Sequence, residues 1–308
     1  IVFGDWSSDV CSSDLAQFVD DMRKQKLRCI LTMSGITWGT MSVILLLAFG
    51  NSLRLASIKN MTGMGNNIVI MGGGRTARTY NGMPAGRVIR IAEESVELLR
   101  RNVPEIDLMS PEIDAYLPLS IGRVRQNTRL VGVYPEYGEM RNLPAEPGGR
   151  FIDFWDMENR RRVVFLGTEV RDKFFGKNSN PVGKTIMVAN TPFTVVGVMR
   201  EKVQNSSYMN RDRSIVFLPF STFREMRNAT QVDRIILRSR DVGDTPRMKA
   251  HLYAVLGKLQ GFSPDDKDAL WMWDTSEMTR YFYYFFLGFQ AFLLLGGSFT
   301  LIVGGIGV

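Results

Sequence analysis

The chain has 308 residues, a formal net charge of +7 and a hydrophobic share of 45%, with only two cysteines and one histidine. No thiol or imidazole cluster can therefore form a zinc, haem or iron–sulfur site. Lys and Arg are scattered among Asp and Glu, which is typical of a solvated surface. We expect no metal, no resident cofactor and no nucleic-acid partner.

Catalytic groups are sparse. A hydrolytic triad would have to use His251, which lies in a predicted helix. An alternative is a membrane-anchored extracytoplasmic enzyme. Its acid–base catalysts would have to be carboxylate pairs, such as Asp153 with Asp156 or Asp265 with Asp266. These pairs are typical of loops and helix caps, with no nucleophile beside them. We therefore expect a protein that is not an enzyme.

The first fourteen residues have an unusual sequence. Ser7–Cys11 is nearly repeated by Ser12–Leu15, without helical or strand periodicity. We interpret residues 1–14 as an artefact or a disordered segment. Residues 15–28 place Leu15, Phe18, Val19 and Met22 on one helical face, which predicts a cytoplasmic amphipathic helix on the membrane surface.

Two uncharged apolar stretches lie at opposite ends of the chain. Residues 29–53 and 281–308 each exceed the roughly 20 residues that cross the hydrocarbon core as a helix. The second opens on a run of six aromatic residues, Tyr281–Phe286, which suits the membrane interface. We predict two transmembrane helices.

Basic residues set the predicted orientation. Arg23, Lys24, Lys26 and Arg28 precede the first span, whereas only Arg54 and Lys59 follow closely. The positive-inside rule therefore places the N-terminus in the cytoplasm and residues 54–280 outside. The same four residues are our candidates for coupling to a cytoplasmic partner, although anchoring to lipid headgroups explains them equally well.

The middle of the chain alternates apolar runs with turns. We predict an α+β fold: a split α/β subdomain (residues 54–121 and 231–280) with an inserted mostly-β subdomain (residues 122–230). One helix is predicted from Pro84 to Pro104 and another from Pro246 to Gln260. The predicted strands are 67–71, 113–121, 129–134, 163–166, 185–188, 193–199, 214–218, 234–238 and 269–273.

One segment imitates a phosphate-binding loop. Asn180–Thr185 ends in Gly-Lys-Thr, but Asn178 stands where the motif needs its first glycine. A strand is predicted after it, so no helix N-terminus would face a phosphate. We interpret the segment as a turn.

Several segments, in order, resemble the MacB/FtsX-like superfamily of ABC transporter permeases, with a MacB-like extracytoplasmic core domain. They are Lys26–Ile36, Gly149–Phe151, Val163–Val170, Phe174–Gly176, Asn180–Ile186, Phe193–Met199, Val216–Phe220, Leu293–Gly297 and Gly304–Val308.

The resemblance implies a four-span permease of the bacterial inner membrane that dimerises, with itself or a second permease. A separate cytoplasmic ATPase would bind ATP, and a periplasmic adaptor or cargo protein is an implied partner. Because the third and fourth spans are missing, we expect the chain to be a fragment. The implied function is export, lipoprotein release or mechanotransmission. The alternative is a two-span membrane sensor with an extracytoplasmic ligand-binding domain.

Overall fold

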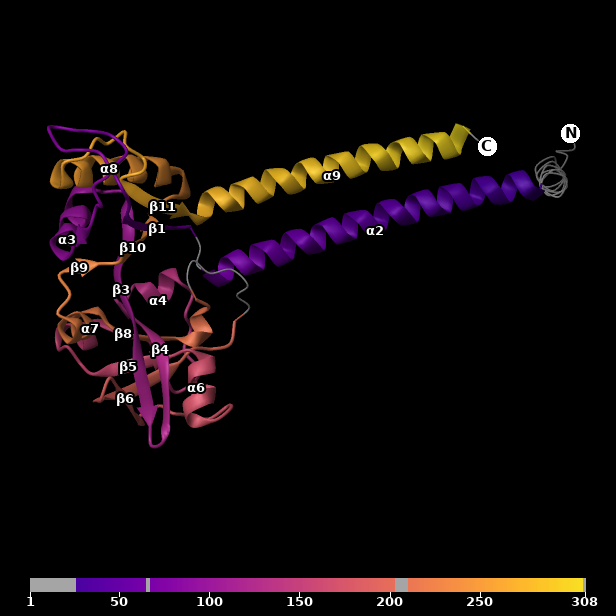
Figure 1. Ribbon diagram of the computed structural model, residues 1–308. Coiled ribbons are helices and arrows are strands. Elements are labelled where there is room, and N and C mark those ends of the chain that lie inside the picture. Colours follow the sequence, from indigo (N-terminus) through magenta and orange to yellow (C-terminus); the bar gives the residue numbers. More distant parts are fainter. Residues whose placement is uncertain (1–25, 65–66, 203–209, 307–308) are drawn as a thin grey trace, which may run out of the picture. The chain divides into compact units, whose positions relative to one another are not determined.

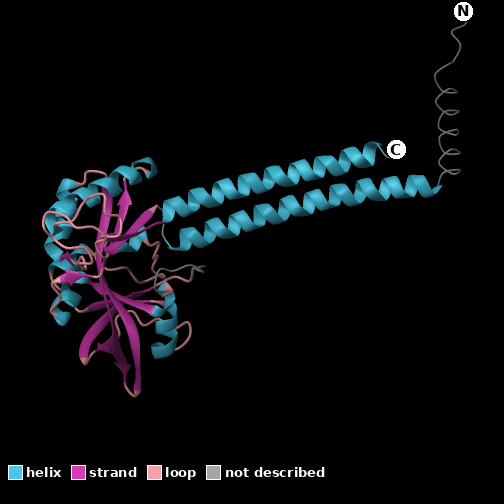
Figure 2. Ribbon diagram, turned by 45° about the horizontal axis from the view of Figure 1, so that its top comes forward, coloured by secondary structure: helices cyan, strands magenta, loops and turns pink. Residues whose placement is uncertain are grey.

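The computed structural model describes residues 26–64, 67–202 and 210–306. The chain forms two compact units: the terminal segments (residues 1–56 and 281–308), and residues 57–280. Figures 1 and 2 show long helices in the first unit and a mixed sheet with shorter helices in the second.

The helices and strands have the following bounds. The helices are α2 (Lys26–Met64), α3 (Glu93–Asn102), α4 (Tyr137–Met140), α5 (Phe154–Glu158), α6 (Thr168–Phe175), α7 (Phe220–Arg227), α8 (Thr245–Gln260) and α9 (Thr275–Ile306), with 3-10 turns η1 (Asp212–Ser214) and η2 (Val242–Asp244). The strands are β1 (Ile68–Gly73), β2 (Ile91–Ala92), β3 (Ile106–Ile121), β4 (Val124–Val133), β5 (Val163–Leu166), β6 (Thr185–Val188), β7 (Thr191–Val198), β8 (Ile215–Pro219), β9 (Gln231–Val232), β10 (Arg234–Ser239) and β11 (Leu270–Asp274).

Helices α2 and α9 fill the two predicted spans. Met33–Leu53 and Thr275–Phe299 are long and apolar enough to cross a membrane, and only 11% of each span is buried, unlike the core helix of a soluble protein. A Cβ on Gly297 would meet Val43, and one on Gly50 would meet Phe289. The two helices therefore pack antiparallel through small residues.

Both helices are longer than the predicted spans. Helix α2 continues beyond residue 53 to Met64, and α9 begins at Thr275 instead of at residue 281. The prediction for residues 1–14, and that for the amphipathic helix at 15–28 up to residue 25, lie outside the described residues. Residues 26–28 belong to α2.

A nine-stranded sheet in the order β11-β1-β10-β3-β4-β8-β5-β7-β6 organises residues 57–280. Strand β3 spans both halves of it. Its first part pairs antiparallel with β10 up to Glu112, and from Ile113 onward it pairs with β4. Leu119 and Ser120 also pair with β6, which closes β3, β4, β8, β5, β7 and β6 into a ring.

An ionic network lies where β3 changes partner. The buried Glu112 accepts a hydrogen bond from Nε of Arg234 at 2.8 Å. Arg234 also pairs with Asp114, which in turn accepts from Nε of the buried Arg129 at 3.1 Å. The network thus joins β10, β3 and β4, and each buried charge in it has a partner of opposite sign.

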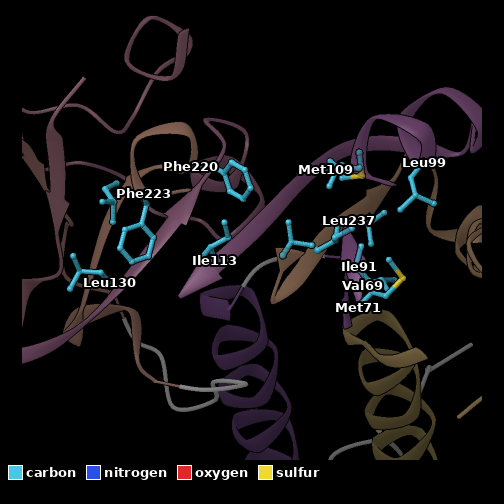
Figure 3. Close-up of a cluster of buried hydrophobic side chains, with 14 of the residues drawn as sticks. Val69, Met71, Ile91, Leu99, Met109, Ile113, Leu130, Phe220, Phe223 and Leu237 are labelled. Atoms are coloured by element: carbon cyan, nitrogen blue, oxygen red, sulfur yellow. The ribbon is translucent and has the colours of Figure 1, made fainter. Parts of the chain in front are cut away.

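The apolar core covers both faces of the central strands. Val69 and Met71 of β1 share one buried cluster with Leu99 of α3 and Leu252 of α8, whereas Ile68 and Ile70 belong to a second cluster. Burial on both faces explains why β1 reads as a continuous apolar run. The first cluster continues through Met109 and Ile113 of β3 to Phe220 and Phe223 (Figure 3).

The strand predictions are confirmed, since every predicted segment overlaps a strand. The helix predicted from Pro84 to Pro104 is confirmed in its second half as α3, but its predicted start is wrong, because α3 begins only at Glu93. Tyr80 and Met83 pair by two backbone hydrogen bonds, and Gly86 has a positive φ of 84°, so turns occupy that stretch. Gly183 has a positive φ of 82° and β6 begins at Thr185, which confirms that the segment Asn180–Thr185 contains a turn instead of a phosphate-binding loop.

The predicted division into two subdomains remains a prediction, because residues 57–280 form one compact unit. The six-strand ring also takes β3 from before the predicted boundary at residue 121. Short helices α4, α5, α6 and α7 accompany the strands between residues 122 and 230.

The carboxylate pairs weighed for catalysis have structural roles. Asp153 and Asp156 form a capping box at the start of α5. Asp156 is fully buried and accepts hydrogen bonds from Arg150 (2.5 and 3.0 Å) and Arg161 (3.1 Å). Burial alone would raise the pKa of Asp156, but the hydrogen bonds and charges around it outweigh burial and hold its pKa below the ordinary value.

We predict that Asp156→Asn lowers the free energy of unfolding by about 2 kcal/mol at neutral pH, the worth of a charged hydrogen bond. The lowered native-state pKa means that this contribution is complete above the unfolded-state pKa and is lost as pH falls through the native pKa. Urea unfolding of the chain in detergent, from pH 7 to pH 3, measures this. The difference between the variant and the wild type should shrink with acidification, and a constant difference would contradict the assignment.

Candidate coupling junction

The predicted coupling residues are only partly described. Arg23 and Lys24 lie outside the described residues, and Lys26 is exposed at the first position of α2. Arg28 lies in the first turn of the same helix. The role of these four residues remains a prediction.

A different site emerges where the long helices join the sheet. Strand β11 ends at Asp274, and α9 begins at the next residue, Thr275. Helix α2 ends at Met64, and three residues separate it from β1. Strands β1 and β11 are antiparallel neighbours, with Val69 opposite Asp274. The two long helices are therefore continuous in the chain with adjacent strands of one sheet.

Two buried hydrogen bonds join the start of α9 to the start of β1. The backbone N–H of Ile68 donates to Oγ1 of Thr275 at 3.1 Å, and the Thr275 hydroxyl donates to the carbonyl of Ile68 at 3.0 Å. Thr275 is only 2% exposed and Ile68 is fully buried. Losing the threonine hydroxyl would leave the buried groups of Ile68 without these partners, which costs about 1–3 kcal/mol.

Asp274 caps α9. Its Oδ1 accepts from the Ser276 N–H at 2.9 Å, from the Ser276 hydroxyl at 2.6 Å and from the Glu277 N–H at 3.4 Å. A carboxylate there satisfies helix donors that lack intrahelical partners and complements the helix dipole. The change from strand to helix is therefore fixed within a single peptide unit.

Lys249 extends this cap to α8. Its Nζ lies 3.3 Å from Oδ2 of Asp274 and 2.8 Å from Oε1 of Glu277. Burial acts to lower the pKa of Lys249, but the hydrogen bonds and charges of Glu277 and Asp274 outweigh it and raise that pKa above the ordinary value. The ammonium therefore stays charged at neutral pH. We call Ile68, Lys249, Asp274, Thr275, Ser276 and Glu277 the coupling junction.

The coupling junction links β1, α8 and the start of α9 through hydrogen bonds and ion pairs. Its polar side chains bond to one another or to the backbone: Thr275 to Ile68, Asp274 to Ser276 and Glu277, and Lys249 to Asp274 and Glu277. His251 is exposed and pairs with Glu105 at 2.9 Å. Among the described residues, no three His, Cys, Asp or Glu side chains are grouped to hold a metal ion.

The sequence contained a signal for this site that our prediction missed. Asp274-Thr275-Ser276-Glu277 has the spacing of a helix capping box, which places the helix start at Thr275. We expected the second span from residue 281 because the charged Glu277 and Arg280 precede the apolar run. The pairing of Thr275 with Ile68, 207 residues away, has no local signal.

Comparison with known proteins identifies the family. The family model of the MacB-like periplasmic core domain matches residues 29–255. A macrolide export ATP-binding/permease protein MacB from Bdellovibrio bacteriovorus is 28% identical over 79% of this chain and 37% of its own length. The MacB of Salmonella paratyphi A is 27% identical over 93% of this chain and 43% of its own length. This chain therefore spans less than half the length of these relatives.

Solved structures share the fold. The periplasmic region of MacB from Actinobacillus actinomycetemcomitans has a TM-score of 0.57 at 18% identity, over 73% of this chain and 96% of that one. The extracellular domain of the noncanonic ABC-type transporter YknZ from Gram-positive bacteria has a TM-score of 0.54 at 16% identity, over 67% of this chain and 100% of that one.

Fold and junction together define a membrane protein whose two apolar helices flank an α/β domain. The chain belongs to the family of the MacB-like periplasmic core domain. The resemblance to MacB/FtsX-like ABC transporter permeases is thereby confirmed, and these comparisons favour the permease over the two-span sensor.

We predict that Thr275→Val speeds hydrogen exchange at the Ile68 amide by about tenfold or more, because the buried N–H loses its acceptor. Thr275→Ser keeps the hydroxyl and should leave exchange near the wild-type rate. Hydrogen-exchange mass spectrometry of peptides covering residues 67–71 measures this. Equal exchange in the valine variant and the wild type would show that the contact does not hold the two elements together.

Proposed function

We propose that the chain is the permease part of an ABC transporter, coupling ATP hydrolysis in the cytoplasm to motion of the domain at residues 57–280. The observation that carries this is the coupling junction. Because Asp274 and Thr275 are adjacent and Thr275 is bonded to Ile68, a displacement of α9 would act directly on β11 and β1. No residue lies between β11 and α9, so no linker there could absorb the displacement of α9.

We place the protein in the bacterial inner membrane, with its N-terminus in the cytoplasm and the domain outside. The two apolar helices and the family of the domain support the membrane location. The orientation rests on the excess of basic residues before the first span.

Export is the role that the relatives favour. Their names combine ATP-binding and permease functions in one protein and include macrolide and pyoverdine export. We propose that this chain likewise works with an ABC ATPase, carried by another part of the same protein or by a separate subunit. Lipoprotein release and mechanotransmission are finer versions of this function.

The proposed assembly is a dimer, formed with a second copy or with a different permease. A periplasmic adaptor or a cargo protein would contact the outer domain. Membrane lipid surrounds α2 and α9, whose large apolar side chains, such as Ile44 and Leu295, are exposed.

The coupling hypothesis predicts that ATP changes hydrogen exchange within residues 57–280 of the full-length protein with its ATPase. Thr275→Val should abolish that change while ATP hydrolysis continues, and Thr275→Ser should preserve it. This readout needs no knowledge of the cargo. An outer domain whose exchange does not respond to ATP in the wild type would overturn the proposal.

The basic residues before the first span allow a separate test. Reversing Arg23, Lys24, Lys26 and Arg28 to Glu should weaken the ATP-dependent exchange change, if these residues contact the ATPase. Reversing Arg54 and Lys59, on the other side of the span, is the matched control. If the ATP response of the first variant is unchanged, the four residues do not couple to the ATPase, and anchoring to lipid headgroups is their remaining role.

A further inference from the structure

Four arginines gather in one loop of the outer domain. Residues 74–90, the arginine loop, contain Arg75, Arg78, Arg87 and Arg90 and no acidic residue. The loop runs beside α8 (Figure 1), and the guanidinium of Arg87 donates to the carbonyls of Gln260 and Gly261 at 3.0 and 2.7 Å. It follows β1 and ends just before β2.

These arginines differ from most others in the domain. Arg129, Arg141 and Arg234, for example, each form an ion pair with a carboxylate. Within the described ranges, no arginine of the loop has a carboxylate within ion-pair distance. The adjoining residues 258–268 contribute Lys258 and Lys267 against three aspartates, so the combined surface holds six cations and three acids.

One of those aspartates is not available to neutralise the surface. Asp266 is buried, and its Oδ2 accepts the backbone N–H groups of Ala77 and Arg78 at 2.8 and 3.1 Å. The hydroxyl of Thr76 accepts the Arg87 N–H at 3.0 Å. The loop backbone is therefore held in place by its own domain, which lowers the entropy cost of presenting the cations to a partner.

Apolar side chains lie among the cations. Met83 is 46% exposed and Val88 is 53% exposed. Methionine and arginine are enriched in protein–protein interfaces, where an apolar centre is surrounded by a polar rim. The loop contains no Trp, Phe or Leu, the residues that form the apolar face of basic membrane-surface helices, and its one aromatic residue is Tyr80.

We propose that the arginine loop docks a partner protein outside the membrane, through an apolar contact on Met83 and Val88 surrounded by Asp or Glu of the partner. Only the placement outside the membrane rests on the proposed function. A second copy of the same loop is disfavoured as the occupant, because the cations would face one another.

The test uses the full-length protein in the cell that makes it, with a photoreactive amino acid in place of Val88. We expect a crosslink to a protein segment rich in Asp and Glu. Arg75→Glu, Arg78→Glu and Arg90→Glu together should reduce its yield about tenfold or more. The matched control reverses Arg123 and Arg125, which lie at the exposed turn between β3 and β4, and should leave the yield unchanged.

Charge exchange completes the experiment. Changing the crosslinked acidic residues of the partner to Lys should restore the crosslink to the triple-Glu variant. The proposal is overturned if no adduct forms, or if adducts form only with lipid or with a second copy of this chain. It is also overturned if the crosslinking yield does not change when the arginines are reversed to Glu. Crosslinking does not require ATP turnover, so a failure here is distinct from a failure of coupling.

Discussion

The outer domain depends on a single strand. β3 is 16 residues long and pairs with β10 in its first part and with β4 and β6 in its second. A strand that serves two sets of neighbours must keep its register in both, because a slip by one residue would move its apolar side chains to the opposite face. Met109 and Ile113, on either side of the partner change, both lie in the larger apolar cluster.

The ionic network at the partner change adds specificity to this arrangement. Glu112 and Arg129 are buried, and removal of Asp114 would take from Arg129 the carboxylate with which it forms its ion pair. Arg234 bridges Glu112 and Asp114, so it bonds to β3 on both sides of the point where the partner changes. The result is one continuous sheet in which β10 connects β1 and β11 to β3.

Much of this fold was predictable because its signals are local. The apolar runs at residues 163–166 and 185–188 predict β5 and β6 with the bounds observed. The predicted start of the first helix at Pro84 was wrong because Val88, Ile91 and Val96 have helical spacing, although the residues before Ile91 lie in turns.

Two glycines in the segments that resemble the family are explained by contacts between residues far apart in the sequence. A Cβ on Gly197 would lie 2.3 Å from the carbonyl oxygen of Arg150, and one on Gly149 would lie 2.8 Å from Cα of Gly197.

The candidate site was less predictable than the fold. The sequence indicated which segments cross the membrane, but the junction depends on the pairing of Ile68 with Thr275 and on Lys249 reaching from α8. Such contacts between distant residues depend on the antiparallel pairing of β1 with β11, which no local pattern encodes. The capping box at Asp274 was the one part of the junction that sequence alone could have located.

Closure of the six-strand ring has a consequence for the domain's resistance to aggregation. Because β6 returns to β3, β11 is the one open edge of the nine-stranded sheet among the strands that the structure describes. Open edges recruit strands from other molecules and so promote aggregation. This edge is five residues long, the Tyr253 hydroxyl donates to the Leu270 carbonyl at 3.3 Å, and Lys249 and Lys267 line the adjacent pocket. The folded domain would therefore expose little backbone on which fibrils could nucleate.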